Sequence, residues 1–409
     1  MKFNKWTLAL AAAGVVSLGS VAQAEEQHQV LTALSQTTLS GYVDTSAIWK
    51  VGTGNAALPG RAYDGADKVD GFNLNVVKLA LSKPLDEGEW AAGYNFSLLF
   101  GPDASTYQTF GGIGKSSAAT VVGTTDFSIQ NANIDLRAPV GNGLDIKVGV
   151  FESPLGYEPF DAASNPNYSR SYGYVLEPKQ HTGVLLSYHL TDWASVYGGV
   201  ANTYAGNINS RATALANGSV PVESEKTYIG GLTLTAPESF GFLKGTVLYG
   251  GVVDGLPGTG AGVTTKDTTS TYVGATIPTP LEGLSLGAAW DYRFNGANAT
   301  TPGSNWAQAI AGYVTYQATE KLKLNNRVDY FSGSDGSLAG LAGVAPNVQD
   351  KLLSETFTVD YSLWANVITR AEFRWDRNLA SDKTYGGLAG VADGDRNAFT
   401  VAANIIYKF

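Results

Sequence analysis

Residues that commonly carry chemistry are scarce in this chain of 409 residues, which contains no cysteine, one methionine and three histidines. Without cysteine the chain can form neither a disulfide framework nor a thiolate metal site. The HExxH pattern of zinc proteases does not occur, and His181 and His189 lie eight residues apart on one expected strand, too far for a shared metal ion. We therefore expect no cofactor, no metal and no enzymatic activity.

Long apolar runs are also missing after the first 24 residues. The start of the chain joins Lys2 and Lys5 to an apolar run from about Thr7 to Leu18, followed by Ala22-Gln23-Ala24, which is the pattern of a secretory signal peptide. The run is too short to cross a bilayer of about 30 Å as a helix, which disfavours a membrane anchor. We expect residues 1–24 to be removed.

Basic residues are fewer than acidic ones. Loss of Lys2 and Lys5 with the signal peptide leaves 25 of the 27 basic residues against 36 acidic ones, a net charge of −11. So acidic a chain is not expected to bind nucleic acid. The 49 glycines disfavour helices, because glycine costs about 1 kcal/mol at a helix interior position. The chain should be mostly strand and loop.

Alternating hydrophobicity supplies the fold prediction. In "LSLGAAWDYRF" (284–294) the apolar side chains share one face, and Ser285, Asp291 and Arg293 share the other. Sixteen such segments follow one another, and the gaps between them alternate between short turns and long polar or Gly-rich loops. The segments begin near residues 39, 70, 89, 125, 143, 180, 194, 226, 240, 269, 284, 306, 322, 351, 367 and 396. A meander of this kind is typical of an all-β, antiparallel, up-and-down transmembrane barrel with short periplasmic turns and long extracellular loops. We assign 25–38 to a periplasmic segment and 39–409 to the barrel.

Charge and aromatic placement agree with a barrel bathed in lipid. The strand charges, including Lys244, fall on the less apolar face, as expected where a Lys or Arg facing lipid at mid-membrane costs about 2 to 4 kcal/mol. Most tryptophans of the mature chain lie at expected strand ends, where an aromatic girdle would meet the headgroups. A soluble two-sheet sandwich remains as an alternative, although its strands would usually be shorter.

The closing segment "FTVAANIIYKF" places Tyr407 and Phe409 on the apolar face. A terminal Phe with Tyr two residues earlier resembles the C-terminal signal that barrel-assembly machinery recognises in outer-membrane proteins. We therefore expect Tyr407 and Phe409 to act as the assembly signal.

The segment from about Asn133 to Asn202 resembles a known protein family. Gly156-Tyr157-Glu158, Asn165 to Ser171 ("NPNYSRS") and "HTGV" from His181 resemble the OmpL-like β-barrel porin family. The resemblance implies a bacterial outer-membrane porin. In sixteen-strand porins the third long loop folds into the lumen and narrows it, so the segment from about Ser153 to Lys179 should do the same. Its constriction charges would be Glu158, Asp161 and Arg170.

The inward face should carry the charges that line the pore. We hypothesise that Arg137, Arg293, Arg327, Arg370 and Arg374 face acidic groups of the inward loop and create a transverse field. The alternative is that the wall charges pair with Asp329, Glu372 or Asp376 and only stiffen the wall. The full set of expected pore-lining residues is Arg137, Lys147, Asp291, Arg293, Lys323, Arg327, Asp329, Arg370, Glu372 and Arg374.

The expected function is a water-filled channel for passive diffusion of small hydrophilic solutes across the outer membrane of a Gram-negative cell. Its partners would be outer-membrane lipid, these solutes, the barrel-assembly machinery and further copies in a homotrimer. The alternative from another class is a non-conducting barrel whose long loops serve adhesion or surface structure.

Overall fold

The computed structural model describes residues 37–51, 71–107, 127–205, 208–211, 224–256, 267–295, 305–334, 351–380, 385 and 395–409. The predicted signal peptide, and nearly all of the predicted periplasmic segment, lie outside these described residues. None of the helices among them is long and apolar enough to cross a membrane.

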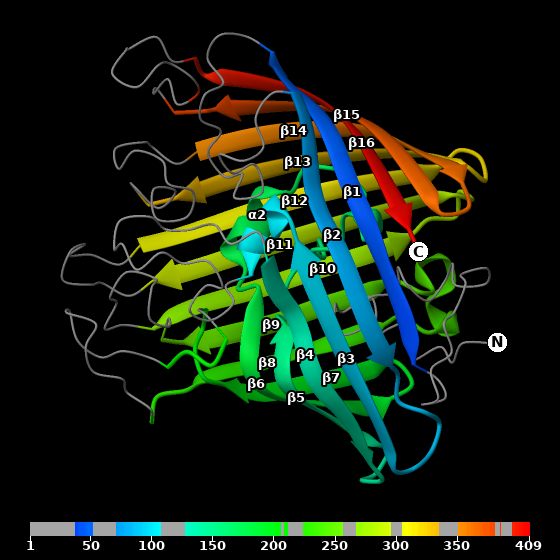
Figure 1. The fold of residues 1–409 in the computed structure, drawn as a ribbon, viewed down its shortest axis with the longest axis vertical. Coiled ribbons are helices and arrows are strands. Elements are labelled where there is room, and N and C mark those ends of the chain that lie inside the picture. Colours follow the sequence, from blue (N-terminus) through cyan, green and yellow to red (C-terminus); the bar gives the residue numbers. More distant parts are fainter. Residues whose placement is uncertain are drawn as a thin grey trace.

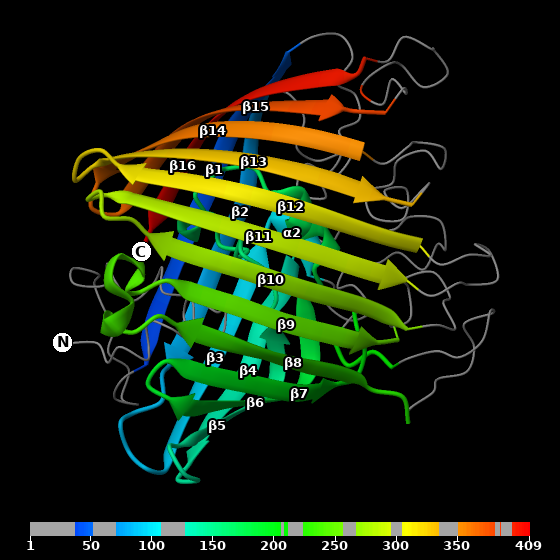
Figure 2. The ribbon, with the colours of Figure 1, turned by 180° about the vertical axis from the view of Figure 1, so that it is seen from behind.

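Sixteen antiparallel strands form one closed barrel, which confirms the predicted fold (Figure 1 and Figure 2). Each strand pairs with its neighbours in sequence, and β1 pairs with β16 from Tyr42–Lys408 to Val51–Phe399, so no strand edge is left open. The strands are β1 (Thr38–Val51), β2 (Gly71–Lys83), β3 (Ala91–Phe100), β4 (Phe127–Ala138), β5 (Leu144–Glu152), β6 (Gln180–Thr191), β7 (Ala194–Ala201), β8 (Thr227–Thr235), β9 (Val247–Gly255), β10 (Thr268–Pro278), β11 (Leu284–Asn295), β12 (Asn305–Gln317), β13 (Leu322–Gly333), β14 (Lys351–Trp364), β15 (Val367–Asn378) and β16 (Asn397–Lys408).

Connections alternate in length around the barrel, as predicted. Those from β2 to β3, from β4 to β5 and from β14 to β15 are short, whereas the connection from β5 to β6 runs from residue 153 to 179. Backbone bonds join Gly41 and Phe409 in both directions, at 2.8 and 3.0 Å, so the first strand and the C-terminus meet at the end of the short turns. We call the two rims the short-turn end and the long-loop end.

The turn before β9 corrects one prediction. The pattern places a strand from about residue 240, but Glu238–Leu243 form a 3-10 helix (η5) and β9 begins at Val247. Gly241 and Gly245 there adopt positive φ, which glycine accepts without strain. Lys244 therefore lies in an exposed turn, paired with Glu238 at 2.5 Å, and is not a wall charge.

Alternation along the strands sorts side chains between the two faces. On β15 the outward Phe373 is 46% exposed, whereas the inward Arg374 is 1% exposed. The outward face is not free of charge: by the same alternation Asp254, Lys351 and Arg377 point outward near the long-loop end, and Glu355 points outward further along β14, opposite Val328 of β13. Charges near a membrane interface cost about 0 to 1 kcal/mol, much less than at mid-membrane.

The seven tryptophans after residue 24 mostly follow the predicted girdle. Those at or beside strand ends are exposed at the barrel surface: Trp49, Trp90, Trp193, Trp306 and Trp364. Trp290 and Trp375 lie inside strands β11 and β15 and are half-buried. Five of these seven tryptophans therefore lie toward the rims, where a membrane-spanning barrel meets the headgroups.

The connection between β5 and β6 lies inside the barrel. It contains a short 3-10 helix, η4 (Ala162–Ser164), and one helical turn, α2 (Tyr172–Leu176), which Figure 1 shows within the ring of strands. The connection after β3 also enters the interior with η3 (Pro102–Thr106), where Tyr107 packs edge-on against Phe160 at 5.0 Å. We call residues 153–179 the inward loop.

Candidate functional site

The inward loop begins and ends at the same point of the wall. The N–H of Ser153 donates to the carbonyl of Lys179 at 3.0 Å, which closes the loop beside β5 and β6. Between these ends only η4 and α2 form regular structure, and neither is long enough to satisfy most of the loop's backbone groups internally. The wall supplies the missing partners.

Three arginines of the wall donate to loop carbonyls. Arg327 (β13) donates to Ser169 O at 2.8 Å and Arg170 O at 3.1 Å, and Arg374 (β15) donates to Arg170 O at 2.5 Å. Arg370 (β15) donates to two further carbonyls, those of Ala162 at 2.7 Å and Asn165 at 2.9 Å. All three guanidinium groups are almost completely covered. They therefore hold the loop against the wall.

Carboxylates accept from the N–H groups of the same stretch. Glu372 (β15) accepts from Tyr168 N at 2.6 Å and Ser169 N at 3.0 Å. Asp329 (β13) accepts from Tyr172 N at 3.0 Å. Within the loop, Glu158 accepts from Ser171 N at 3.0 Å. Charged groups that bond backbone amides in this way form the stronger class of hydrogen bond.

The loop also reaches the strands across the barrel seam. Lys78 (β2) pairs with Asp161 at 2.7 Å, and the hydroxyl of Tyr42 (β1) donates to the same carboxylate at 3.2 Å. Tyr168 Oη donates to Ser46 Oγ (β1) at 3.0 Å. The loop therefore crosses the lumen from β5 and β6 to β1 and β2.

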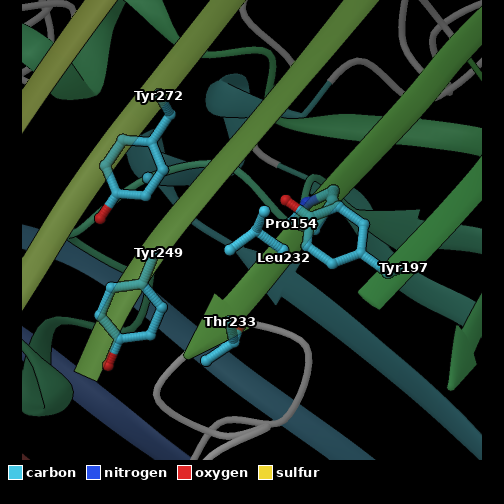
Figure 3. A pocket seen from close by; sticks show the side chains of 7 residues that line it. Pro154, Tyr197, Leu232, Thr233, Tyr249 and Tyr272 are labelled. Atoms are coloured by element: carbon cyan, nitrogen blue, oxygen red, sulfur yellow. The ribbon is translucent and has the colours of Figure 1, made fainter. Parts of the chain in front are cut away.

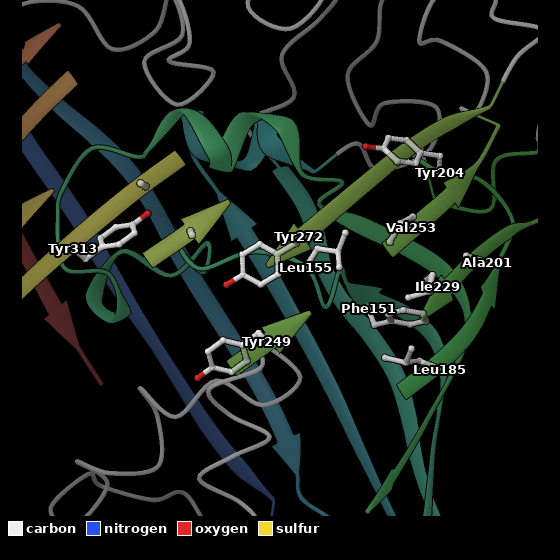
Figure 4. Packing of buried hydrophobic residues seen from close by; sticks show 12 residues of the cluster. Phe151, Leu155, Leu185, Ala201, Tyr204, Ile229, Tyr249, Val253, Tyr272 and Tyr313 are labelled. Carbon is white, nitrogen blue, oxygen red and sulfur yellow. The ribbon is translucent and has the colours of Figure 1, made fainter. Parts of the chain in front are cut away.

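The wall from β6 to β12 contacts the loop through apolar and aromatic groups. Leu155 packs into a buried cluster with side chains of these strands (Figure 4), and Tyr157 stacks on Tyr313 (β12) with ring centroids 4.2 Å apart. Beside them, a pocket next to Pro154 is lined by tyrosines from three strands (Figure 3): Tyr197 (β7), Tyr249 (β9) and Tyr272 (β10). A Cβ at either Gly231 or Gly251 would lie 2.2 Å from Tyr197 Oη, so these glycines make room for the ring.

Glu158 sits where the two kinds of contact meet. It accepts from Arg327 at 3.0 Å and from the hydroxyl of Tyr313 at 3.0 Å. Burial alone would raise the pKa of the Glu158 carboxyl, but Arg327, Arg170, the Ser171 N–H and Tyr313 together hold it below its usual value. The carboxyl is therefore ionised at neutral pH.

A second charged group closes the loop near β6. Glu177 pairs with Lys179 at 3.0 Å, and the Lys179 ammonium lies 3.1 Å from the ring centroid of Tyr174. Burial raises the pKa of Glu177 to about 7, against the opposing effect of Lys179. Burial likewise lowers the pKa of Lys179, which Glu177 counteracts. The Gly156 backbone lies against the Glu177 carboxylate, since a Cβ there would approach it to 2.4 Å.

The structure tests the transverse-field hypothesis residue by residue. Of the five arginines, Arg327 does meet an acid of the loop, Glu158. Arg137 pairs with Asp145 at 2.6 Å near the short-turn end, and Arg293 donates to Asn295 and lies over the Tyr204 ring. For these two arginines the transverse field stays a prediction. Arg137 lies near the short-turn end and Arg327 lies against the inward loop, a difference in depth that alternation along a strand does not reveal.

Both interpretations of the remaining charges apply in part. Arg374 pairs with Asp376 at 2.8 Å and Arg327 with Asp329 at 3.1 Å, as the alternative of wall pairing anticipates, while the same arginines bond the loop. Of the ten expected pore-lining residues, six are covered, namely Asp291, Arg327, Asp329, Arg370, Glu372 and Arg374, and four are partly exposed, namely Arg137, Lys147, Arg293 and Lys323. Of the loop charges, Glu158 and Arg170 are covered and Asp161 is partly exposed.

Sequence reasoning missed several of these residues. Glu177 and Lys179 lie at the end of the inward loop, where the alternation of a strand does not apply. Alternation places Lys78 on the inward face but does not identify its partner, Asp161. It also missed a GxSxG match at Gly283–Gly287. Ser285 in that match lies on strand β11, whereas the hydrolase pattern requires a strand-to-helix elbow. Among the described residues, no group of three or more acidic or histidine side chains could hold a metal ion.

Comparison with known proteins decides the family. The family model described as "Putative beta-barrel porin-2, OmpL-like" matches residues 36–409. The chain belongs to this OmpL-like porin family. A comparison with curated protein sequences found no match.

Solved structures show the same fold at low sequence identity to this OmpL-like porin. An anion-selective porin from Comamonas acidovorans is 11% identical with a TM-score of 0.58, and 91% of this chain and 99% of that chain are covered. The outer membrane channel DcaP of Acinetobacter baumannii is 14% identical with a TM-score of 0.57, covering 91% and 97%. A trimer form of OmpT from Vibrio cholerae is 12% identical with a TM-score of 0.52, covering 91% and 99%.

Proposed function

We propose that this OmpL-like porin is a passive diffusion channel for small hydrophilic solutes in a bacterial outer membrane. The observation that supports the proposal is the closed barrel whose outer face is mainly apolar and whose interior contains most of the charged side chains of the strands. Such a surface is stable where hydrocarbon surrounds the barrel and water enters it. The inward loop is the constriction of this channel, and Glu158, Asp161 and Arg170 fix its shape.

The proposal extends to targeting and assembly. Residues 1–24 direct secretion and are cleaved. Tyr407 and Phe409 are exposed on the outer face at the short-turn end, where assembly machinery in the periplasm would read them. A homotrimer is proposed because a barrel of this fold, OmpT, has a trimer form.

Single-channel recording in planar bilayers tests the function. The purified, folded protein should give stepwise currents, and uncharged solutes of increasing size should cease to block conductance at a cut-off set by the constriction. An inserted barrel, identified by its heat-dependent gel shift, that passes no current would reject the channel. That result would favour the alternative function, a non-conducting barrel whose long loops serve adhesion or surface structure.

The constriction has its own test. Replacing residues 158–172 with a Gly-Ser linker of equal length removes the contacts with Arg327, Arg370 and Arg374, so the conductance and the size cut-off should both rise. A linker of the same composition in place of Thr319-Glu320-Lys321, in a short turn, is the matched control and should leave both unchanged. Unaltered currents in the loop variant would show that another segment limits the pore.

A further inference from the structure

The charges inside the barrel divide by sign according to whether water reaches them. Among the described inward-facing side chains of the strands and the inward loop, the covered ones are mainly acidic, and those partly exposed are mainly basic. The covered set comprises Asp44, Glu158, Glu177, Asp291, Asp329, Asp360, Glu372 and Asp376 with Arg170, Arg327, Arg370 and Arg374. The partly exposed set comprises Lys50, Lys78, Arg137, Lys147, Lys179, Arg293, Lys323 and Lys408 with Asp135, Asp145, Glu152 and Asp161.

The division follows from how the loop is held. Five of the covered carboxylates, Glu158, Asp329, Asp360, Glu372 and Asp376, pair with the covered arginines or accept from loop N–H groups. Their charge is compensated at hydrogen-bond distance. Burial also raises the pKa of Glu177 to about 7, so near neutral pH this carboxyl is often uncharged. Acids therefore predominate among the covered charges, and bases predominate among the charges that water reaches.

The partly exposed set carries eight basic and four acidic groups, a net charge of +4 in a mature chain whose net charge is −11. Three of its acids pair with bases of the same set, as Lys78–Asp161, Arg137–Asp145 and Lys147–Asp135. Among the described residues, neither the Lys323 ammonium nor the Arg293 guanidinium forms an ion pair with a carboxylate within 4.0 Å. These two cations stand on opposite sides of the loop, since Lys323 is near the short-turn end and Arg293 near the long-loop end.

We infer that the channel admits small anions in preference to cations of equal size, and that Arg293 and Lys323 are its main selectivity residues. The inference rests on the proposed channel function. A narrow passage through a low-dielectric wall focuses the potential of the charges that reach its water, so a local excess of basic groups raises the anion concentration there. The negative charge elsewhere on the chain is screened within about 8 to 10 Å in salt.

The test is the reversal potential of the full-length mature protein in a potassium chloride gradient across a planar bilayer. The wild type should show a chloride permeability roughly two- to ten-fold above that of potassium. The double variant Arg293→Gln with Lys323→Gln should lower this ratio by roughly two- to five-fold, and Arg293→Glu with Lys323→Glu should lower it further. Neither side chain bonds the inward loop, so single-channel conductance should persist in these variants.

Matched controls separate a charge in the lumen from charge in general. Arg377 lies near the same end as Arg293 but points outward, and Lys321 lies in the exposed turn beside Lys323. Arg377→Gln with Lys321→Gln makes the same change in net charge and should leave the permeability ratio at the wild-type value. Arg293→Lys with Lys323→Arg keeps both charges and should do the same.

Three results would overturn the inference: a wild type that is unselective or prefers potassium, a neutralised double variant equal to the wild type, or a control pair that shifts the ratio as much as the lumen pair. In each of these the current itself remains, so the channel function stands. Only an absence of current in the wild type rejects the channel function. The wild-type current is therefore recorded in equal salt on both sides before any gradient is applied.

Discussion

The wall formed by β13 to β15 and the wall formed by β6 to β12 contact the same inward loop in different ways. On the first, Arg327, Arg370 and Arg374 bond loop carbonyls, and Glu372 bonds loop N–H groups. On the second, Leu155 and the ring of Tyr157 pack against apolar and tyrosine side chains. Hydrogen bonds depend on direction and fix the path of the backbone, whereas apolar packing depends on volume and tolerates adjustment.

The comparison teaches how a long connection with little regular structure can keep one conformation inside a barrel. Its buried backbone groups need partners, and a strand wall with alternating side chains can present them at regular spacing. The apolar wall then adds burial without competing for those groups. Four changes would test this division of labour, taken from the largest expected effect to the smallest.

Loss of Arg327 should have the largest effect. Arg327→Ala leaves the buried carboxylates of Glu158 and Asp329 without their cation and removes its bonds to Ser169 and Arg170. Breaking a buried ion pair typically costs about 3 to 5 kcal/mol. Hydrogen–deuterium exchange of the 158–172 backbone should rise sharply. Arg327→Lys, which keeps the charge but not the guanidinium geometry, should give an intermediate rise in exchange. If the loop backbone of Arg327→Ala were as protected from exchange as in the wild type, the anchoring role of Arg327 would be refuted.

Loss of packing on the opposite wall should cost less and disturb the loop differently. Leu155→Ala leaves a cavity in a cluster of buried side chains, with an expected loss of about 2 to 4 kcal/mol in the free energy of unfolding. Thermal unfolding followed by circular dichroism measures the loss. Exchange of the 158–172 backbone should change little, because its bonds to β13 and β15 remain. If exchange there rose as much as in Arg327→Ala, the two walls would not act separately.

The sequence predicts the strands well because alternation and turn length are local properties. Predicted strand starts near residues 284, 322 and 351 agree with β11, β13 and β14. The start of β9 was predicted too early because the apolar residues of η5, which lie in a turn, resemble those of a strand. The loop contacts could not be predicted, since Arg327 and Ser169 are 158 residues apart and alternation gives the face of a side chain but not its depth. The inward path of the loop came from the family resemblance alone.

Docking of the loop should also weaken as the pH rises. The pKa of Glu177 is raised from 4.5 to about 7 by burial, so the docked loop holds a proton that the undocked loop has lost. This stabilisation is fully present below about pH 4.5 and disappears as the pH rises through about 7, by at most about 3 kcal/mol. Exchange of the loop backbone should therefore be faster at pH 8 than at pH 5, after correction for intrinsic rates. In Glu177→Gln, which resembles the protonated form, the difference in exchange between pH 8 and pH 5 should be smaller. An equal difference in both proteins would mean that the pH dependence comes from other groups that face this carboxyl, namely Lys179, Asp291 and Glu158.

The smallest effect is expected from a wall charge that touches neither kind of loop contact. Arg137 pairs with Asp145 across β4 and β5, with side chains 30% and 20% exposed, and the structure shows no bond from it to the inward loop. A partly exposed pair is screened by water, so Arg137→Gln should cost less than about 1 kcal/mol in thermal unfolding and leave loop exchange unchanged. Because Arg137 and Arg327 are both inward-facing arginines in salt bridges, the pair of variants isolates the loop contact as the cause of any difference. Equal loop exchange in the two variants would mean that wall charge in general, and not the bonds from β13 and β15, keeps the loop in place.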